Sequence, residues 1–174
     1  MTVVVAVKGE WKTWMVSDDA TDAGAMRYRE PSKIWQPFPN LAIGGAGEHA
    51  ALTKFFYHDW EFLPPGKGFD AARWAWTNIC QPAKELFGEV DDMELLMCIG
   101  KELVIVDGTW APHIEDSEYA AVGVGAPFAL GSLHRADNDD VMGLSLEDAQ
   151  RAVQAAEYFC PLVGALRPEV VVQW

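Results

Sequence analysis

The start of the chain carries the pattern that most restricts its fold, two short β-type runs joined by a tight turn. Residues 3–7 read Val-Val-Val-Ala-Val and residues 13–16 read Thr-Trp-Met-Val. Both runs are rich in residue types that favour strands. Gly9 and Glu10 lie between them, and glycine in the first position of a two-residue loop suits a type II′ turn. We therefore predict a β-hairpin at the beginning of the chain.

The predicted turn also implies a register for this hairpin. With Gly9 and Glu10 as the loop, Lys8 pairs with Trp11, Val5 with Trp14 and Val3 with Val16. Thr2 then lies opposite Ser17, with Asp18 adjacent. The hairpin alone would bring the N-terminal end of the chain beside an acidic residue.

The rest of the chain predicts strands and helices in blocks rather than in alternation. Asp70 suits the N-cap of a helix that ends at Gly88, and Ser145 with Asp148 resembles a capping box. We expect helices at 48–62, 70–87, 127–136 and 145–159, and further strands at 41–43, 94–99, 102–106, 119–124 and 169–173. This order predicts an α+β fold in which helix pairs cover two sheets, a four-layer αββα sandwich.

Length and charge limit the classes of protein to consider. A chain of 174 residues, half of them apolar, suits one domain over residues 1–174. The formal net charge is -13 and the pI is near 4.5. Binding to phosphate groups needs clustered Lys and Arg, so we expect neither nucleic acid nor an anionic membrane as a partner.

The metal-ligating residue types form no recognisable site. Cys80, Cys98 and Cys160 are odd in number and share no metal-ligand spacing, and the four histidines have no ligand spacing either. No Gly-rich phosphate loop is present, so we expect no metal and no cofactor. No apolar run approaches the roughly 18 residues of a membrane helix. A reducing cytoplasm fits this composition best.

Several short motifs in a fixed order add a resemblance to a known family. Thr2 precedes the first apolar strand, Asp18 follows sixteen residues later, and Lys33 lies within Pro-Ser-Lys-Ile. Gly-Gly-Ala-Gly occupies residues 44–47, and residues 123–129 read Gly-Val-Gly-Ala-Pro-Phe-Ala. Over essentially the whole chain this order resembles the β-subunits of the proteasome and bacterial HslV, which are N-terminal nucleophile hydrolases.

The resemblance implies that Thr2 is a nucleophile. In this class the base that takes the hydroxyl proton is the α-amino group of the same residue, whose pKa is ordinarily about 7.7 to 8.0. Met1 must therefore be removed, and a small second residue permits that removal. The alternative is that Thr2 merely begins a strand.

Two charged residues would assist Thr2 if the resemblance holds. Lys33 would place a positive charge beside the hydroxyl and help the proton to move, and Asp18 would hold that ammonium group in position. Asp19, next to Asp18, is an alternative acidic residue. The alternative for Lys33 and for Asp18 is an ordinary surface charge.

Three further residues are assigned to substrate by the resemblance. The backbone N–H of Gly47 would stabilise the oxyanion, because glycine permits close approach of a substrate carbonyl. Thr21 and Gly45 would lie on the cleft walls and pair with an extended peptide. For Gly47 the alternative is tight packing of a strand against a helix.

The chain also departs from the family pattern. Val124 replaces the serine of the Gly-Ser-Gly turn, and residues 157–162 lack the expected Asp and Ser. Our leading hypothesis is a threonine-type peptidase subunit of a homo-oligomeric ring. It would act on peptide or unfolded protein, and the resemblance leaves room for an ATPase partner. The alternatives are a catalytically inactive scaffolding subunit with the same fold and an amidase that acts on non-peptide substrates.

Overall fold

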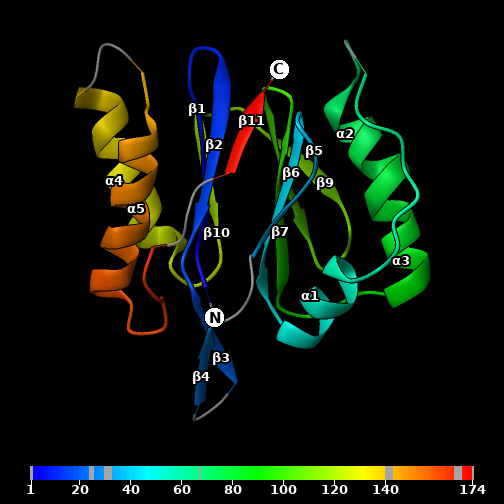
Figure 1. Ribbon diagram of the computed structural model, residues 1–174, viewed down its shortest axis with the longest axis horizontal. Coiled ribbons are helices and arrows are strands. Elements are labelled where there is room, and N and C mark those ends of the chain that lie inside the picture. The colour runs from blue at the N-terminus through cyan, green and yellow to red at the C-terminus, as the bar shows by residue number, and fades with distance from the viewer. Residues whose placement is uncertain are drawn as a thin grey trace.

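The computed structural model describes residues 2–23, 26–29, 33–66, 68–139, 143–166 and 170–173. Figure 1 shows four layers: helices α4 and α5, a first sheet, a second sheet, and helices α1, α2 and α3 on the far side. The two sheets face each other, and each has helices on its outer face. The predicted α+β architecture, a four-layer αββα sandwich, is confirmed.

The first sheet is built on the N-terminal hairpin. Its strand order is β10-β1-β2-β11, and all neighbouring strands are antiparallel. The strands are β1 (Val4–Lys8), β2 (Lys12–Ser17), β10 (Tyr119–Val122) and β11 (Val170–Gln173). Four of the predicted strand segments, at 3–7, 13–16, 119–124 and 169–173, therefore belong to one sheet, and a hairpin joins the first two.

The predicted register of this hairpin is wrong by two residues. Lys8 pairs with Thr13 and Val4 pairs with Ser17. Gly9, Glu10 and Trp11 lie between the two strands, and the Gly9 N–H donates to the Lys12 carbonyl at 2.9 Å. Because side chains alternate with a period of two, this shift keeps each residue on its expected face.

The second sheet has the order β5-β6-β7-β8-β9. Its strands are β5 (Ile34–Phe38), β6 (Leu41–Gly47), β7 (Met93–Ile99), β8 (Glu102–Asp107) and β9 (Pro112–Glu115). The predicted turn at Gly100 and Lys101 joins β7 to β8. Strands β5 and β9 were not predicted. They contain Pro37 and Pro112 and form the two edges, where a missing N–H is tolerated.

A separate two-stranded hairpin, β3 (Ala20–Ala23) and β4 (Met26–Arg29), was also not predicted. It projects beyond the sandwich at the end where the chain begins (Figure 1).

The first predicted helix is shorter than expected. Helix α1 covers His49–Phe56, whereas the pattern indicated residues 48–62. The indole N–H of Trp60 donates to the Phe55 carbonyl at 2.8 Å, so a side chain takes up a carbonyl that a longer helix would use. The spacing of the apolar residues predicted a helix here but not where it ends.

The second predicted helix is confirmed with an interruption. It comprises α2 (Ala71–Ala75), a π-helical turn η1 (Trp76–Cys80) and α3 (Gln81–Phe87). The Asp70 side chain caps it, and Gly88 ends it with φ +69. Pro82 has no N–H to give to the preceding turn, which accounts for the wider turn before it.

The last two helices, α4 (Ala126–Asp139) and α5 (Leu146–Phe159), pack against each other and against the first sheet (Figure 1). The predicted capping box is present, since the Ser145 side chain accepts from the Asp148 N–H and the Asp148 carboxylate accepts from the Ser145 N–H. Both helices were predicted within a few residues.

The core lies in three sections between the four layers. In β1, Val5 and Val7 face α4 and α5, whereas Val4 and Ala6 face the second sheet. A strand buried on both faces reads as a continuous apolar run, as residues 3–7 do. The outer core around α1, α2 and α3 combines aliphatic residues with aromatic ones, among them Trp110, which is fully buried.

Candidate functional site

Three polar side chains from separate segments of the chain meet at one end of the first sheet. The Thr2 hydroxyl donates to the Asp18 carboxylate, and the Lys33 ammonium group donates to the Thr2 hydroxyl. Lys33 Nζ also lies 2.8 Å from Asp18 Oδ1. The exposed fractions are 4% for Thr2, 0% for Asp18 and 8% for Lys33. We call Thr2, Asp18 and Lys33 the polar cluster.

Two strand ends and a distant loop hold Asp18 in place. Asp18 follows β2, and its N–H donates to the Val3 carbonyl at 3.3 Å. Its Oδ1 accepts from the Val3 N–H at 3.0 Å, and its Oδ2 accepts from the Gly164 N–H at 2.7 Å. Asp19 instead accepts from the Ala165 N–H at 3.0 Å. Of the two candidate acidic residues, Asp18 is the one that contacts Thr2 and Lys33.

Lys33 joins the polar cluster from the segment that leads into β5. It immediately precedes β5, and its carbonyl accepts from the Gly45 N–H at 3.2 Å. A buried ammonium group is tolerated when a carboxylate and other acceptors surround it. The Lys33 side chain is therefore paired and buried rather than an ordinary surface charge.

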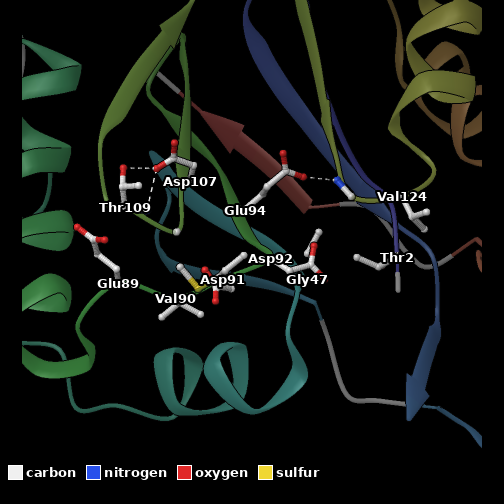
Figure 2. Close-up of a pocket in the computed structure, with 14 residues that line it drawn as sticks. Thr2, Gly47, Glu89, Val90, Asp91, Asp92, Glu94, Asp107, Thr109 and Val124 are labelled. Carbon is white, nitrogen blue, oxygen red and sulfur yellow. Dashed lines mark hydrogen bonds between the residues drawn. The ribbon is translucent and has the colours of Figure 1, made fainter. Parts of the chain in front are cut away.

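The main chain of Thr2 is held by the turn that precedes α4. The Gly125 N–H donates to the Thr2 carbonyl at 3.3 Å. A Cβ on Gly123, which has φ +94, would come within 2.3 Å of the same carbonyl oxygen, so glycine is required there. The Gly123 N–H donates to Glu94 Oε2 at 2.8 Å (Figure 2). Val124 is 40% exposed and has no group that could replace the serine hydroxyl.

Gly47 ends β6 beside this turn and has φ +114. A Cβ at this position would lie 1.8 Å from the carbonyl oxygen of Asp92. Glycine is thus required by the backbone conformation and by the close approach of the loop that leads into β7. The close neighbour is that loop and not a helix. An oxyanion role for its N–H stays a prediction.

A pocket of about 570 Å³ opens beside Thr2 and Gly47. Figure 2 shows Asp92 and Glu94 next to them, with Asp107, Thr109 and Glu89 further along. Its lining residues are Thr2, Ala46, Gly47, Glu89, Val90, Asp91, Asp92, Met93, Glu94, Asp107, Gly108, Thr109, Gly123 and Val124. The pocket therefore extends from Thr2 to the β8–β9 turn.

The lining is acidic. The described residues that line it include five carboxylates, Glu89, Asp91, Asp92, Glu94 and Asp107, and no basic side chain. A hydrogen bond from the Thr109 side chain lowers the pKa of Asp107; burial opposes this effect, and hydrogen bonds from the backbone N–H groups of Thr109 and Ala111 add to it. Asp107 is therefore ionised at neutral pH.

The two predicted substrate residues, Thr21 and Gly45, lie in β3 and β6. Thr21 lies in β3 opposite Tyr28, and its side chain is outside the described part of the protein. Gly45 is buried, and a Cβ on it would come within 2.6 Å of Leu52 and 3.0 Å of Phe56 in α1. Packing against α1 explains this glycine. Pairing of either residue with a peptide stays a prediction.

The acidic residues of the pocket were missed by sequence reasoning. Glu89, Asp91 and Asp92 fall in a short segment before β7, and Asp107 ends β8, so only the pairing of these strands brings them together. The acidic segment at 89–94 could have indicated these residues, but such a segment does not stand out in a chain that is acidic throughout.

Among the described residues, no three His, Cys, Asp or Glu side chains are grouped so that they could hold a metal ion. Within the same part of the chain, none of the helices combines the length and the apolar character that a membrane crossing requires.

The comparisons with known proteins support the fold. No protein-family model matches the chain. No curated protein sequence matches it either. Among solved structures, Thiobacillus denitrificans BPH is similar with a TM-score of 0.76 and 18% identity, covering 98% of this chain and 97% of that one. A complex of Thiobacillus denitrificans BPH with epoxomicin has a TM-score of 0.73 and 19% identity, covering 98% of each chain.

A eukaryotic HslV, from Trypanosoma brucei, has a TM-score of 0.73 and 15% identity over 99% of both chains. Identities this low establish a shared fold and leave activity to be tested. The likeness spans nearly the whole length of each chain and agrees with the order of layers. The chain has the N-terminal nucleophile hydrolase fold, of the form found in HslV and proteasome-like proteins.

Proposed function

We propose that this protein is a threonine-type amide hydrolase that cleaves peptides, with Thr2 as the nucleophile after removal of Met1. The observation that carries the proposal is the contact of the Thr2 hydroxyl with both Lys33 and Asp18, at one end of an open pocket. A hydroxyl needs such surroundings to act as a nucleophile at neutral pH.

The reaction begins when the Thr2 hydroxyl oxygen attacks the carbonyl carbon of the scissile amide. The hydroxyl proton passes to the free α-amino group of Thr2, and the backbone N–H of Gly47 stabilises the oxyanion that forms. The amide C–N bond then breaks, and the leaving amine takes up the proton. Water hydrolyses the remaining ester and restores the hydroxyl group.

Lys33 and Asp18 prepare the hydroxyl for this step. The ammonium group of Lys33 stabilises negative charge that develops on the Thr2 oxygen. Asp18 orients both groups, because its Oδ1 accepts from each of them while Oδ2 is held by Gly164. The cluster is assembled around the hydroxyl in advance, which lowers the cost of reaching the transition state.

A solved complex with epoxomicin is known for Thiobacillus denitrificans BPH, which shares the fold. This favours a reactive threonine in the present chain and suggests the chemistry of a probe. A peptide epoxyketone needs both the hydroxyl and the amine of one residue to close its ring. It therefore tests the two groups together.

We further propose a homo-oligomeric ring in the cytoplasm that takes peptide or unfolded protein, with an ATPase as a candidate partner. Exposed aromatic side chains on the helices support contacts between copies. Trp76 is 41% exposed, Phe159 is 62% exposed and Tyr158 is 82% exposed. Aromatic residues of this kind are enriched at interfaces. Light scattering that finds only a 19.2 kDa monomer at micromolar concentration would count against a ring.

The proposal is tested on protein whose intact mass shows that Met1 is absent. Wild type should cleave peptide amides and form a covalent adduct with the epoxyketone. Thr2→Ala should do neither, with a loss of turnover of at least about 10³-fold. Thr2→Ser retains both groups and should keep part of the activity. Failure of processed wild type both to cleave a broad peptide library and to form the adduct would refute the hydrolase function.

Two further variants test whether Lys33 contributes to turnover. Thr53→Ala removes an exposed hydroxyl from α1, outside the pocket lining, and should leave turnover unchanged. Lys33→Ala should reduce kcat by about 10²-fold or more. Turnover within twofold of wild type in Lys33→Ala would show that Lys33 has no catalytic role.

A catalytically silent scaffold with the same fold is the second candidate. The observation in its favour is Val124, which lines the pocket next to Thr2 but cannot donate or accept a hydrogen bond. This candidate predicts that processed protein assembles normally, shows no turnover and is unaffected by Thr2→Ala.

A further inference from the structure

We infer that the pocket beside Thr2 binds the cationic side chain of a Lys or Arg residue next to the scissile bond. The inference rests on the proposed function, since it names the class of peptide that the same site selects. Its first support is position. Thr2 and Gly47 line one end of the pocket, so a side chain that enters it belongs to a residue close to the reacting carbonyl.

The size and shape of the pocket fit a long side chain. Its volume of about 570 Å³ is within the range of roughly 300 to 1,000 Å³ that is typical of small-molecule sites. In Figure 2 the labelled residues run from Thr2 through Asp92 and Glu94 to Asp107 and Thr109. A short side chain would reach only the first part of this path.

The charge of the lining selects a cation. Of the five carboxylates, Glu89 is paired with Lys84 at 3.3 Å, on side chains that are both well exposed. Glu94 accepts from the Gly123 N–H and Asp107 from Thr109, and neither of these donors carries a charge. Four carboxylates thus remain without a basic partner among the described residues. In a chain of net charge -13, this surface attracts cations and repels acidic peptides.

The apolar part of the lining matches the stem of such a side chain. Ala46, Val90, Met93 and Val124 line the same pocket as the carboxylates. Lys and Arg lay their methylene stems along apolar surface and keep the charged end among polar groups. The combination of apolar walls and distributed carboxylates distinguishes this pocket from a purely acidic surface.

The carboxylates are spread along the pocket rather than gathered around a point. No three of the described acidic, Cys or His side chains form a group that could hold a metal ion. We therefore assign the pocket to an elongated organic cation, and competition by a divalent cation is one outcome that the experiment distinguishes.

The test compares three peptides that differ at one position next to the cleaved bond, Lys, norleucine or Glu, and each is offered on either side of that bond. Wild type should show a kcat/KM about tenfold higher for Lys than for norleucine on one side, and the lowest value for Glu. The ratio should fall as salt is raised from about 20 mM to about 500 mM, because salt screens exposed charges.

The variant that removes the selection is Asp91→Asn with Asp92→Asn. Both side chains are exposed and line the pocket, and neither belongs to the polar cluster. The ratio of Lys to norleucine should fall at least threefold. Glu10→Gln, which removes a charge from the turn at the far end of the β1–β2 hairpin, should leave the ratio unchanged.

Binding to Thr2→Ala gives a readout that does not need catalysis. Calorimetry should find tighter binding of the Lys peptide than of the norleucine peptide, and the Asp91→Asn and Asp92→Asn changes should remove the difference. Cleavage without preference for Lys, together with equal binding, overturns the inference and leaves the proposed function intact. Preferential Lys binding without cleavage by wild type refutes the proposed function and retains the pocket's selectivity. Loss of the Lys preference on adding millimolar Ca²⁺ at constant ionic strength would assign the pocket to a metal ion instead.

Discussion

The polar cluster and the acidic pocket lie side by side, yet they use carboxylates in opposite ways. In the cluster, one fully buried aspartate, Asp18, accepts hydrogen bonds from Thr2, Lys33 and two backbone N–H groups. In the pocket, several exposed carboxylates of the same sign lie along one opening. Thr2 is the only residue of the cluster that also lines the pocket.

The difference shows how one site can divide two tasks. Buried opposite charges with satisfied hydrogen bonds hold a reactive group in a single geometry, because any departure leaves a charge without a partner in a medium of low dielectric constant. Exposed like charges are hydrated and contribute little to stability, so they are available to a ligand.

The cluster should be costly to break. Asp18→Ala removes the acceptor shared by Thr2, Lys33, Val3 and Gly164, and we expect a loss of about 3 to 5 kcal/mol in the free energy of unfolding. Urea denaturation measures this loss. Asp59→Ala, at an exposed aspartate outside the pocket lining, should change stability by no more than about 0.5 kcal/mol. Equal effects of the two changes would remove the distinction between buried and exposed carboxylates.

Gly47, which lines the pocket beside Thr2 of the polar cluster, should not tolerate a side chain. Gly47→Ala requires an alanine at φ +114 and places a Cβ 1.8 Å from the Asp92 carbonyl oxygen, so the main chain must move. We expect a loss of about 2 to 4 kcal/mol from strain and overpacking. Gly66→Ala is the matched control, because nothing lies within 4 Å of a Cβ there. A destabilisation of Gly47→Ala no larger than that of Gly66→Ala would contradict the close approach.

A small effect is expected where Thr109 supports Asp107 at the far end of the pocket. Thr109→Val removes one hydrogen bond to an exposed carboxylate, and the loss at neutral pH should be a few tenths of a kcal/mol after solvent screening. The folded-state pKa of Asp107 is lowered, so this contribution is complete above the unfolded value of about 3.9 and disappears as the pH falls through the folded pKa. Urea denaturation at a series of pH values from about 7 to 3 should show the two proteins converging in acid. If the difference in the free energy of unfolding between wild type and Thr109→Val widens in acid, the hydrogen bond from Thr109 does not lower the pKa of Asp107.

The smallest effect should come from neutralising a pocket carboxylate. Asp92 has φ 53, a conformation that asparagine adopts readily, and its side chain is exposed. Asp92→Asn should therefore change the free energy of unfolding by less than about 0.5 kcal/mol and in the stabilising direction, because it relieves repulsion between like charges. Thermal denaturation at low salt measures it. A loss above about 1 kcal/mol would show that Asp92 has a structural partner.

Local patterns in the sequence predicted much of the architecture. The apolar run at 3–7, the cap at Asp70, the capping box at Ser145 and the turn at Gly100 each depend on neighbours along the chain. Such features were found because the residues that cause them are adjacent. That residues 1–174 form a single domain stays a prediction.

Other elements depend on contacts between residues that the local sequence pattern does not reveal. Helix α1 ends at Phe56 because Trp60 folds back on it, and the hairpin register depends on the hydrogen bond from Gly9 to Lys12. Strand β5 contains a proline and is compatible with a sheet only as an edge. Each of these is decided by a contact that competes with the local preference.

The candidate site divides in the same way. Sequence order and the family resemblance were sufficient to single out Thr2, Asp18 and Lys33, and the N-terminal hairpin explains why Asp18 lies near the chain's beginning. Only the tertiary structure revealed that Gly164 holds Asp18 and that the carboxylates of two strand ends line one pocket with Thr2. The physical reason is distance along the chain: hydrogen bonds and fields act through space, and folding brings together residues that no local pattern relates.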